Sequence, residues 1–366
     1  MLKLREKILN SVKPFIALPL AGLDLSDTSV KFIKFGSSRS GLTFDFWGEF
    51  ELALGLIEKG EIKDEAGLVK FLSSWFAKEG WRLRQVFFVA SLPEEKSFLR
   101  MIQLPKIKQE DVANAVRWEI EANIPLPIEE AVFDYEIVKP SAGELDHLDV
   151  VVTAFPRSII DSYLRVFRGV GIKIAFLELE SQAAARALAS SLDGKLPRIL
   201  VDMGRNRTSI IFSAGGSIVF TDTVEFGGAL LEENIAKALS VDKKEAMAIK
   251  KEQGLDPTAY GGKVFLALAP ALEQLKAEIK RVADYYKAHD SHVHDVGRAV
   301  DKIVLTGGDA NLDGLDTYLA SGLSIETQRA NPFVAVEGRL NMVVPPIPQK
   351  RALGFTTAVG LALRGI

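Results

Sequence analysis

The chain has 366 residues, 48% of them hydrophobic, which is enough for about two to three domains with large cores. Its 45 Lys and Arg against 48 Asp and Glu give a net charge of -3, without the basic excess of nucleic-acid-binding proteins. It has no cysteine, which excludes disulfide scaffolds and Cys-ligated metal sites, and no apolar run of about 18 residues that could form a membrane helix. We therefore expect a cytoplasmic protein that does not bind nucleic acid.

Residues 1–20 form a basic, amphipathic extension. Leu2, Leu4 and Ile8 fall on one face of a helix, and lysines and arginines surround them. Two interpretations remain open: peripheral contact with anionic lipid or a membrane-bound partner, or a frayed terminus.

Residues 22–36 predict a β-hairpin with a carboxylate at its turn. An apolar strand leads into Asp24, small residues including Ser26 and Ser29 make the turn, and an alternating strand follows. Lys31 lies close enough to the turn to reach a phosphate, or it is a solvated strand residue.

The next segment, 84–171, reads as a compact unit inserted into a larger domain. Its pattern predicts strand, strand, helix, strand, strand and helix in that order. A strand over 172–179 then leads into an alanine-rich helix whose small side chains would allow close packing. Glu180 begins this helix, either as a favourable acid at the helix N-terminus or as a residue that positions a metal or water.

A second carboxylate hairpin covers residues 199–216. An apolar strand delivers Asp202, Gly204 makes the turn, and Thr208 and Ser209 begin the return strand. Backbone N–H groups and hydroxyls at such a tip can bind an anion, and Asp202 can hold a cation through water, although an ordinary surface hairpin has the same composition. Two acidic hairpins suggest two related halves that face one cleft.

Three later features fit a cleft that binds an anion. Gly227 and Gly228 directly precede a helix, whose N-terminal N–H groups favour anions. A charged cluster that includes Glu278 and Arg281 lies on a long helix and by default faces solvent. A strand from Lys302 ends in Gly307 and Gly308, and a final small-residue helix, 352–364, is expected to pack against the helix of 183–189.

The order of these parts resembles the actin, Hsp70 and FtsA superfamily, and within it the PilM family of type IV pilus assembly proteins. The motifs that carry the resemblance are LDLSDTSVKFIKF, FLRMIQLP, WEIEANIPLP, VDMGRNRTS, EFGGALLEENIAKAL, EIKRVADYY and KIVLTGGDANLDGL. The resemblance implies an α/β, actin-like (ribonuclease H-like) fold with duplicated domains around a nucleotide cleft and an inserted α+β subdomain. The implied ranges are 1–20 for the extension; 21–83 with 172–190 and 345–366 for the first actin-like subdomain; 84–171 for the inserted subdomain; and 191–344 for the second domain, with a smaller helical lobe at about 226–300.

The resemblance also implies an ATP and Mg²⁺ site. The residues that match its phosphate loops, double glycine and adenosine side are Asp24, Ser26, Ser29, Lys31, Asp202, Gly204, Thr208, Ser209, Gly227, Gly228, Glu278, Arg281, Gly307 and Gly308. Asp24 and Asp202 would hold magnesium through water, and Glu180 is the candidate catalytic residue. Ser26 stands where the family usually has glycine, and Arg205 and Arg207 replace small residues at the second tip, where they could pair with phosphate or crowd it.

The implied function is an ATP-binding scaffold of pilus or related secretion assembly, with slow ATP hydrolysis at most. Its implied partner is the N-terminal cytoplasmic tail of a PilN-like inner-membrane protein, gripped between the first actin-like subdomain and the inserted unit within the pilus assembly complex. The chain would lie in the cytoplasm, peripheral to the inner membrane through this partner, and self-association stays open. Two alternatives also stay open: an FtsA-like polymerising protein, and a small-molecule kinase of the same fold.

Overall fold

The computed structural model describes residues 19–38, 41–79, 85–123, 127–138, 146–192, 196–288, 299–337, 339–340, 345–364 and 366. The extension predicted over residues 1–20 therefore lies, except for its last two residues, outside this part of the chain. Among the described residues, no helix combines the length and the apolar character needed to cross a membrane.

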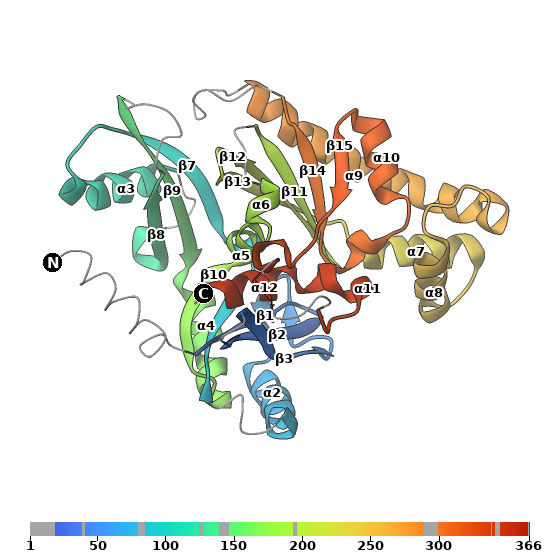
Figure 1. The fold of residues 1–366 in the computed structure, drawn as a ribbon, viewed down its shortest axis with the longest axis horizontal. Helices are drawn as coiled ribbons and strands as arrows, with labels where there is room; N and C mark the ends of the chain where they lie inside the picture. The colour runs from blue at the N-terminus through green and yellow to red at the C-terminus, as the bar shows by residue number, and fades with distance from the viewer. Residues whose placement is uncertain are drawn as a thin grey trace.

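The first half of the molecule is built on a five-stranded sheet (Figure 1). Its strands are, in spatial order, β10 (Ile174–Leu179), β6 (Phe87–Leu92), β1 (Leu20–Leu25), β2 (Ser29–Ser38) and β3 (Gly41–Glu51). The first three run parallel, and β2 and β3 continue the sheet antiparallel. Between β3 and the first helix, a two-stranded ribbon joins β4 (Ile57–Glu58) to β5 (Glu61–Ile62).

The second half repeats this strand order. Its strands are β15 (Glu326–Arg329), β14 (Lys302–Thr306), β11 (Arg198–Met203), β12 (Thr208–Ala214) and β13 (Ser217–Val224). Again the first three run parallel, and the last two continue antiparallel. The duplication predicted from the two carboxylate hairpins is confirmed, because the β1–β2 and β11–β12 hairpins occupy equivalent places in two sheets of one topology.

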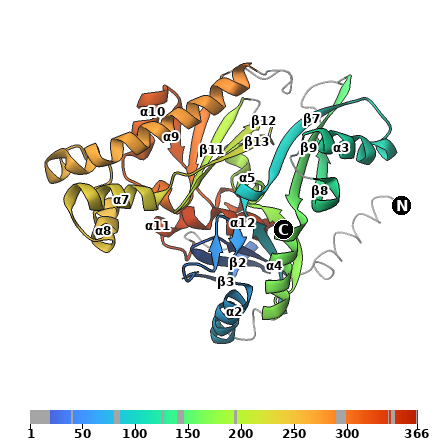
Figure 2. The same ribbon diagram turned by 180° about the vertical axis from the view of Figure 1, so that it is seen from behind.

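Helices cover both sheets. The first half has α2 (Glu65–Glu79), α4 (Arg157–Val170), α5 (Glu180–Ala187), α6 (Ala189–Leu192), α11 (Gln349–Ala352) and α12 (Thr356–Leu363). The second half has α7 (Gly228–Leu239), α8 (Lys243–Gln253), α9 (Lys263–Ala288) and α10 (Leu315–Leu323). In Figure 2, α7, α8 and the start of α9 project from one side of the second sheet as a helical lobe. Each half buries its own apolar core, since alternate strand residues face one stripe of each helix.

Helices α5 and α12 pack at the base of the cleft. The Cβ that Gly360 lacks would stand 1.7 Å from the carbonyl oxygen of Ala183, so only glycine allows this approach. The predicted packing of the last helix against the alanine-rich helix is thus confirmed.

The inserted unit comprises β7 (Phe98–Pro105), α3 (Gln109–Asn123), β8 (Ala131–Ile137) and β9 (His147–Pro156). It has a small core of its own, in which Val112, Val116 and Ile120 of α3 pack on the sheet. Strand β7 also pairs with β13 of the second half, but through one residue pair only, Phe220 with Arg100. This pair joins the strands of the inserted unit to those of the second half, and together they form one eight-stranded sheet.

The range 84–171 predicted for the inserted unit differs from this arrangement at both ends. Strand β6 lies between β1 and β10 in the first sheet, and α4 packs against α2. Both therefore complete the first half, as β14 and α10 complete the second. Strand pairing joins distant segments, so sequence order alone grouped β6 and α4 with their neighbours along the chain.

Candidate functional site

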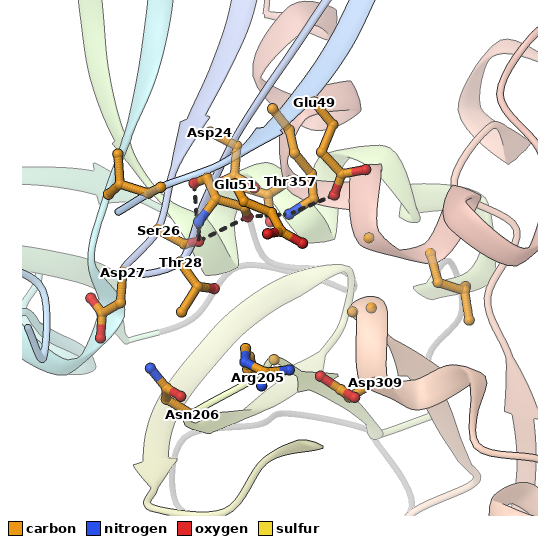
Figure 3. A pocket seen from close by; sticks show the side chains of 18 of the residues that line it. Asp24, Ser26, Asp27, Thr28, Glu49, Glu51, Arg205, Asn206, Asp309 and Thr357 are labelled. Carbon is orange, nitrogen blue, oxygen red and sulfur yellow. Dashed lines mark hydrogen bonds and ion pairs between the residues drawn. The ribbon is translucent and has the colours of Figure 1, made fainter. Parts of the chain in front are cut away.

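A cavity of about 840 Å³ lies between the two halves. Both predicted hairpins line it, together with segments that precede α10 and α12. Figure 3 shows Asp27 and Thr28 of the first hairpin turn on one side, and Arg205 and Asn206 of the second turn opposite.

The first hairpin presents a carboxylate, hydroxyls and an amine. Asp24, Ser26, Ser29 and Lys31 all line the cavity, as the sequence predicts. The Lys31 amine donates to the Ser29 hydroxyl at 2.7 Å, and the Ser91 hydroxyl donates to Asp24 at 3.1 Å. Burial raises the pKa of Asp24, and the nearby Lys31 charge partly offsets that effect.

The second hairpin contributes another carboxylate. Asp202, Gly204 and Ser209 line the cavity. Burial, together with the Asp24 charge, raises the pKa of Asp202 to about 6. Thr208 does not line the cavity, because its side chain is fully buried and donates to the Phe226 carbonyl at 2.8 Å. Its role here is structural.

The two predicted glycine pairs lie in different places. Gly307 and Gly308 line the cavity. Gly307 has φ +88°, and a Cβ there would stand 2.4 Å from the Met203 carbonyl oxygen, while one on Gly308 would meet no atom within 4 Å. Gly227 and Gly228 instead pack behind the cavity wall, where a Cβ on Gly228 would collide with the Asp309 carboxylate.

Glu180 faces the cavity, but it does not stand alone. The Arg207 guanidinium lies 3.5 Å from its carboxylate, 2.7 Å from that of Glu95 and 3.4 Å from that of Asp27. Burial raises the pKa of Glu180 well above its usual range, although Arg207 opposes the shift. Arg207, for which pairing with phosphate and crowding it were both left open, thus meets three carboxylates of the protein.

Helix α8 forms the far end of the cavity, which sequence reasoning missed. Met247 and Lys251 line it, and the buried Lys250 amine lies 2.8 Å from Glu232 and 2.5 Å from Asp309. The only sequence signal was the charged character of this helix, which is equally typical of a solvated surface.

Glu278 and Arg281 do not reach the cavity. They lie on α9, where Arg281 pairs with Glu278 at 2.7 Å and with Asp222 of β13. Helix α9 packs along the sheet with its polar face outward, so this cluster lies outside the residues that line the cleft. The prediction placed both residues on the adenosine side of the cleft, whereas the structure has them on the outward face of α9.

A second cavity, of about 990 Å³, lies between the first half and the inserted unit. Consecutive residues of two strands line it: 174–179 of β10 and 132–136 of β8. Both are edge strands of their sheets. Since neighbouring residues of a strand point to opposite faces, a cavity that touches every residue meets each strand from its unpaired edge.

Charged groups close one end of this second cavity. The buried Glu178 carboxylate pairs with Arg186, and it also lies 3.1 Å from Arg364. The Arg364 guanidinium stands 4.5 Å from the ring centroid of Phe176. The remaining lining is mainly aliphatic and aromatic.

Comparison with known proteins gives a family and a fold. Residues 22–366 match the family model described as "Type IV pilus assembly protein PilM". The cell division protein FtsA of Bacillus subtilis is 29% identical over 98 residues, which are 27% of this chain and 22% of FtsA. The chain thus aligns with less than a quarter of that relative's length.

Solved structures resemble the whole fold. The PilM-PilN type IV pilus biogenesis complex contains a chain with TM-score 0.80 and 24% identity, with 95% of this chain and 99% of that chain covered. MreB5 of Spiroplasma citri bound to ADP gives TM-score 0.53 and 13% identity, with 88% and 95% covered. These likenesses show the actin-like fold.

Proposed function

The chain belongs to the PilM family of type IV pilus assembly proteins, and we propose that it is a cytoplasmic scaffold that binds ATP with Mg²⁺ between its halves. The observation that carries this proposal is the cavity lined by both Asp hairpins. The structure of MreB5, which has the same fold, was solved with ADP.

The residues that line the cavity fit a nucleotide and a hard cation. Asp24 and Asp202 supply carboxylate oxygens, Lys31 a positive charge, and Gly307 with Gly308 a wall without side chains. Among the described residues, no group of three or more acidic or His side chains could hold a metal directly. That suits Mg²⁺, which usually keeps several waters and binds through one or two carboxylates and the phosphates. When bound, the ion would neutralise phosphate charge beside these acids.

We infer that the protein hydrolyses ATP slowly at most. The candidate base, Glu180, shares its carboxylate with Arg207. A base must offer a free carboxylate oxygen to the attacking water, and the Arg207 guanidinium already lies 3.5 Å from the carboxylate of Glu180. The site therefore favours binding over turnover.

The second cavity supports a partner site for the N-terminal tail of a PilN-like inner-membrane protein. It lies where the family resemblance expects that tail, between the first half and the inserted unit. The unpaired edges of β8 and β10 can donate and accept backbone hydrogen bonds, so an extended apolar segment fits there. The partner would hold the protein beside the inner membrane, within the pilus assembly complex.

Isothermal titration of ATP with Mg²⁺ tests the nucleotide site. Wild-type protein is expected to bind, and Asp202→Ala is expected to lose most of that affinity because a cation ligand is removed. Equal affinity in both proteins would contradict the proposed site.

A pull-down tests the partner. Immobilised peptides from the N-terminal tails of neighbouring inner-membrane proteins are incubated with the protein, with and without ATP. Retention by a PilN-like tail is expected, and failure of every tail to retain the protein would contradict the partner site.

A further inference from the structure

Arg207 joins the two halves of the molecule across the cleft. It belongs to the β11–β12 turn of the second half, whereas its three carboxylate partners belong to the first. Asp27 lies in the β1–β2 turn, Glu95 in the short helix that follows β6, and Glu180 at the start of α5. One side chain thus contacts three separate segments of the opposite half.

Burial makes the loss of this contact costly. The Arg207 side chain is 16% exposed, and those of Asp27, Glu95 and Glu180 are 9%, 15% and 14% exposed. Charges withdrawn from water interact more strongly than exposed ones, and removal of one partner leaves the others uncompensated. Without the guanidinium, three carboxylates would face one another in the cleft.

Two other ion pairs show why Arg207 is distinct. Lys59 pairs with Glu225 between the same two halves, but their side chains are 77% and 82% exposed, and such pairs contribute little. Arg205, two residues away on the same turn, pairs with Glu232 of α7 at 2.9 Å, so that contact stays within the second half.

We propose that Arg207 is a clasp between the two halves, and that it sets how fast the cleft opens and releases bound nucleotide. This inference rests on the proposed nucleotide site. At one end of the cavity the halves are bonded together, because the Gly307 N–H donates to the Leu353 carbonyl at 3.2 Å, so opening must separate the hairpin turns. A nucleotide between those turns leaves only when the Arg207 contacts break. Arg207 thereby acts as a positioning residue and not as a phosphate ligand.

Stopped-flow release of a fluorescent ATP analogue, mant-ATP, tests the proposal. The complex with Mg²⁺ is mixed with excess unlabelled ATP, and the fluorescence decay gives the dissociation rate. Arg207→Met keeps side-chain length without charge and is expected to release mant-ATP about tenfold faster or more, because a buried ion-pair hub is lost. The control Lys59→Met is expected to stay within about twofold of wild type.

A rate for Arg207→Met within about twofold of wild type, or equal acceleration in Arg207→Met and Lys59→Met, would overturn the proposal. Glu95→Gln removes one partner and keeps the guanidinium, and it is expected to accelerate release by a smaller factor. No acceleration in Glu95→Gln also counts against the clasp.

Hydrogen exchange on nucleotide-free protein separates this inference from the proposed function. The Lys59 and Gly60 amides each donate to the Asp27 carboxylate at 3.0 Å and report on that turn. The clasp predicts faster exchange there in Arg207→Met than in Arg205→Met, and equal exchange would refute it. If wild-type protein fails to bind mant-ATP, the nucleotide site is wrong, and the exchange result still decides the clasp.

Discussion

The missing side chain of Gly360 is what allows helix α12 to lie against the backbone of Ala183 on α5. A Cβ at this position would stand 1.7 Å from the Ala183 carbonyl oxygen, far inside contact distance. We therefore expect Gly360→Ala to lower the free energy of unfolding by about 3 kcal/mol, because the two helices must move apart. Urea unfolding followed by circular dichroism measures this change.

A matched control is Gly308→Ala. A Cβ on Gly308 meets no atom within 4 Å and projects into open space, so stability is expected to change by less than about 0.5 kcal/mol. Because Gly308 lines the cavity proposed for the nucleotide, the same change is expected to weaken ATP binding. Similar unfolding curves for the two alanine variants would contradict the packing argument.

The raised pKa of Asp202 predicts a pH-dependent stability. Its pKa is about 6 in the folded protein, against an ordinary value of 3.8. Between these values the folded state binds more protons than the unfolded state, so this group's contribution is fully present below about pH 4 and is lost as pH rises through 6. Asp202→Asn is expected to be more stable than wild type at pH 7, by on the order of 2–3 kcal/mol, while losing Mg²⁺-dependent ATP binding.

Unfolding at several pH values between 4 and 8 checks this expectation. Subtraction of the variant curve from the wild-type curve removes the groups that both proteins share. A difference that stays constant over this range would show that Asp202 is not perturbed by burial.

The Lys250 amine connects α8 to Glu232 and Asp309 beneath the far end of the cavity between the two halves. Lys250→Met is expected to lower the free energy of unfolding by about 3 kcal/mol, because two carboxylates lose a buried cation. Lys251→Met is the control, because the Lys251 side chain is exposed at the cavity wall. This change is expected to alter the free energy of unfolding by less than about 0.5 kcal/mol. Denaturant unfolding compares the two, and equal losses would contradict the interpretation.

Phe176 of β10 tests the second cavity. Its ring is 41% exposed and forms part of the wall beneath Arg364. Phe176→Ala is expected to weaken binding of the PilN-like tail peptide roughly tenfold, because aromatic anchors carry much of the energy of such interfaces. Fluorescence anisotropy with a labelled peptide measures the affinity.

Trp118→Ala is the control for this change, because Trp118 is 70% exposed on α3 and lies outside the cavity lining. ATP affinity is expected to stay unchanged in both variants. Equal peptide binding by wild type and Phe176→Ala would remove β10 from the partner site.

Much of the fold could be predicted from local sequence patterns. The hairpins around Asp24 and Asp202 were predictable because apolar alternation and small turn residues stand next to each other in sequence. The repeated strand order then follows, since each hairpin directs its half of the chain into the same sheet arrangement.

Contacts between segments that are distant in sequence could not be predicted from these local patterns. The partners of Arg207 lie at positions 27, 95 and 180, so no window of sequence contains them. Glu278 and Arg281 form an obvious charged cluster, but periodicity could not tell whether the polar face of α9 met the cleft or solvent. In sequence, Thr208 resembles the other hydroxyl residues beside the turn. Because neighbouring residues of a strand point to opposite faces, its side chain lies in the core instead.

The inserted unit meets the second half through a single ladder pair, Phe220 with Arg100, and through Met101, which packs in the core of the second half. Within the unit, by contrast, β7 pairs with β9 along its whole length, from Phe98 with Ala154 to Pro105 with His147. The eight-stranded sheet therefore has a mechanical weak point between β7 and β13. Separation there would leave the unit joined to the first half, because β6 leads into β7 and β9 leads into α4.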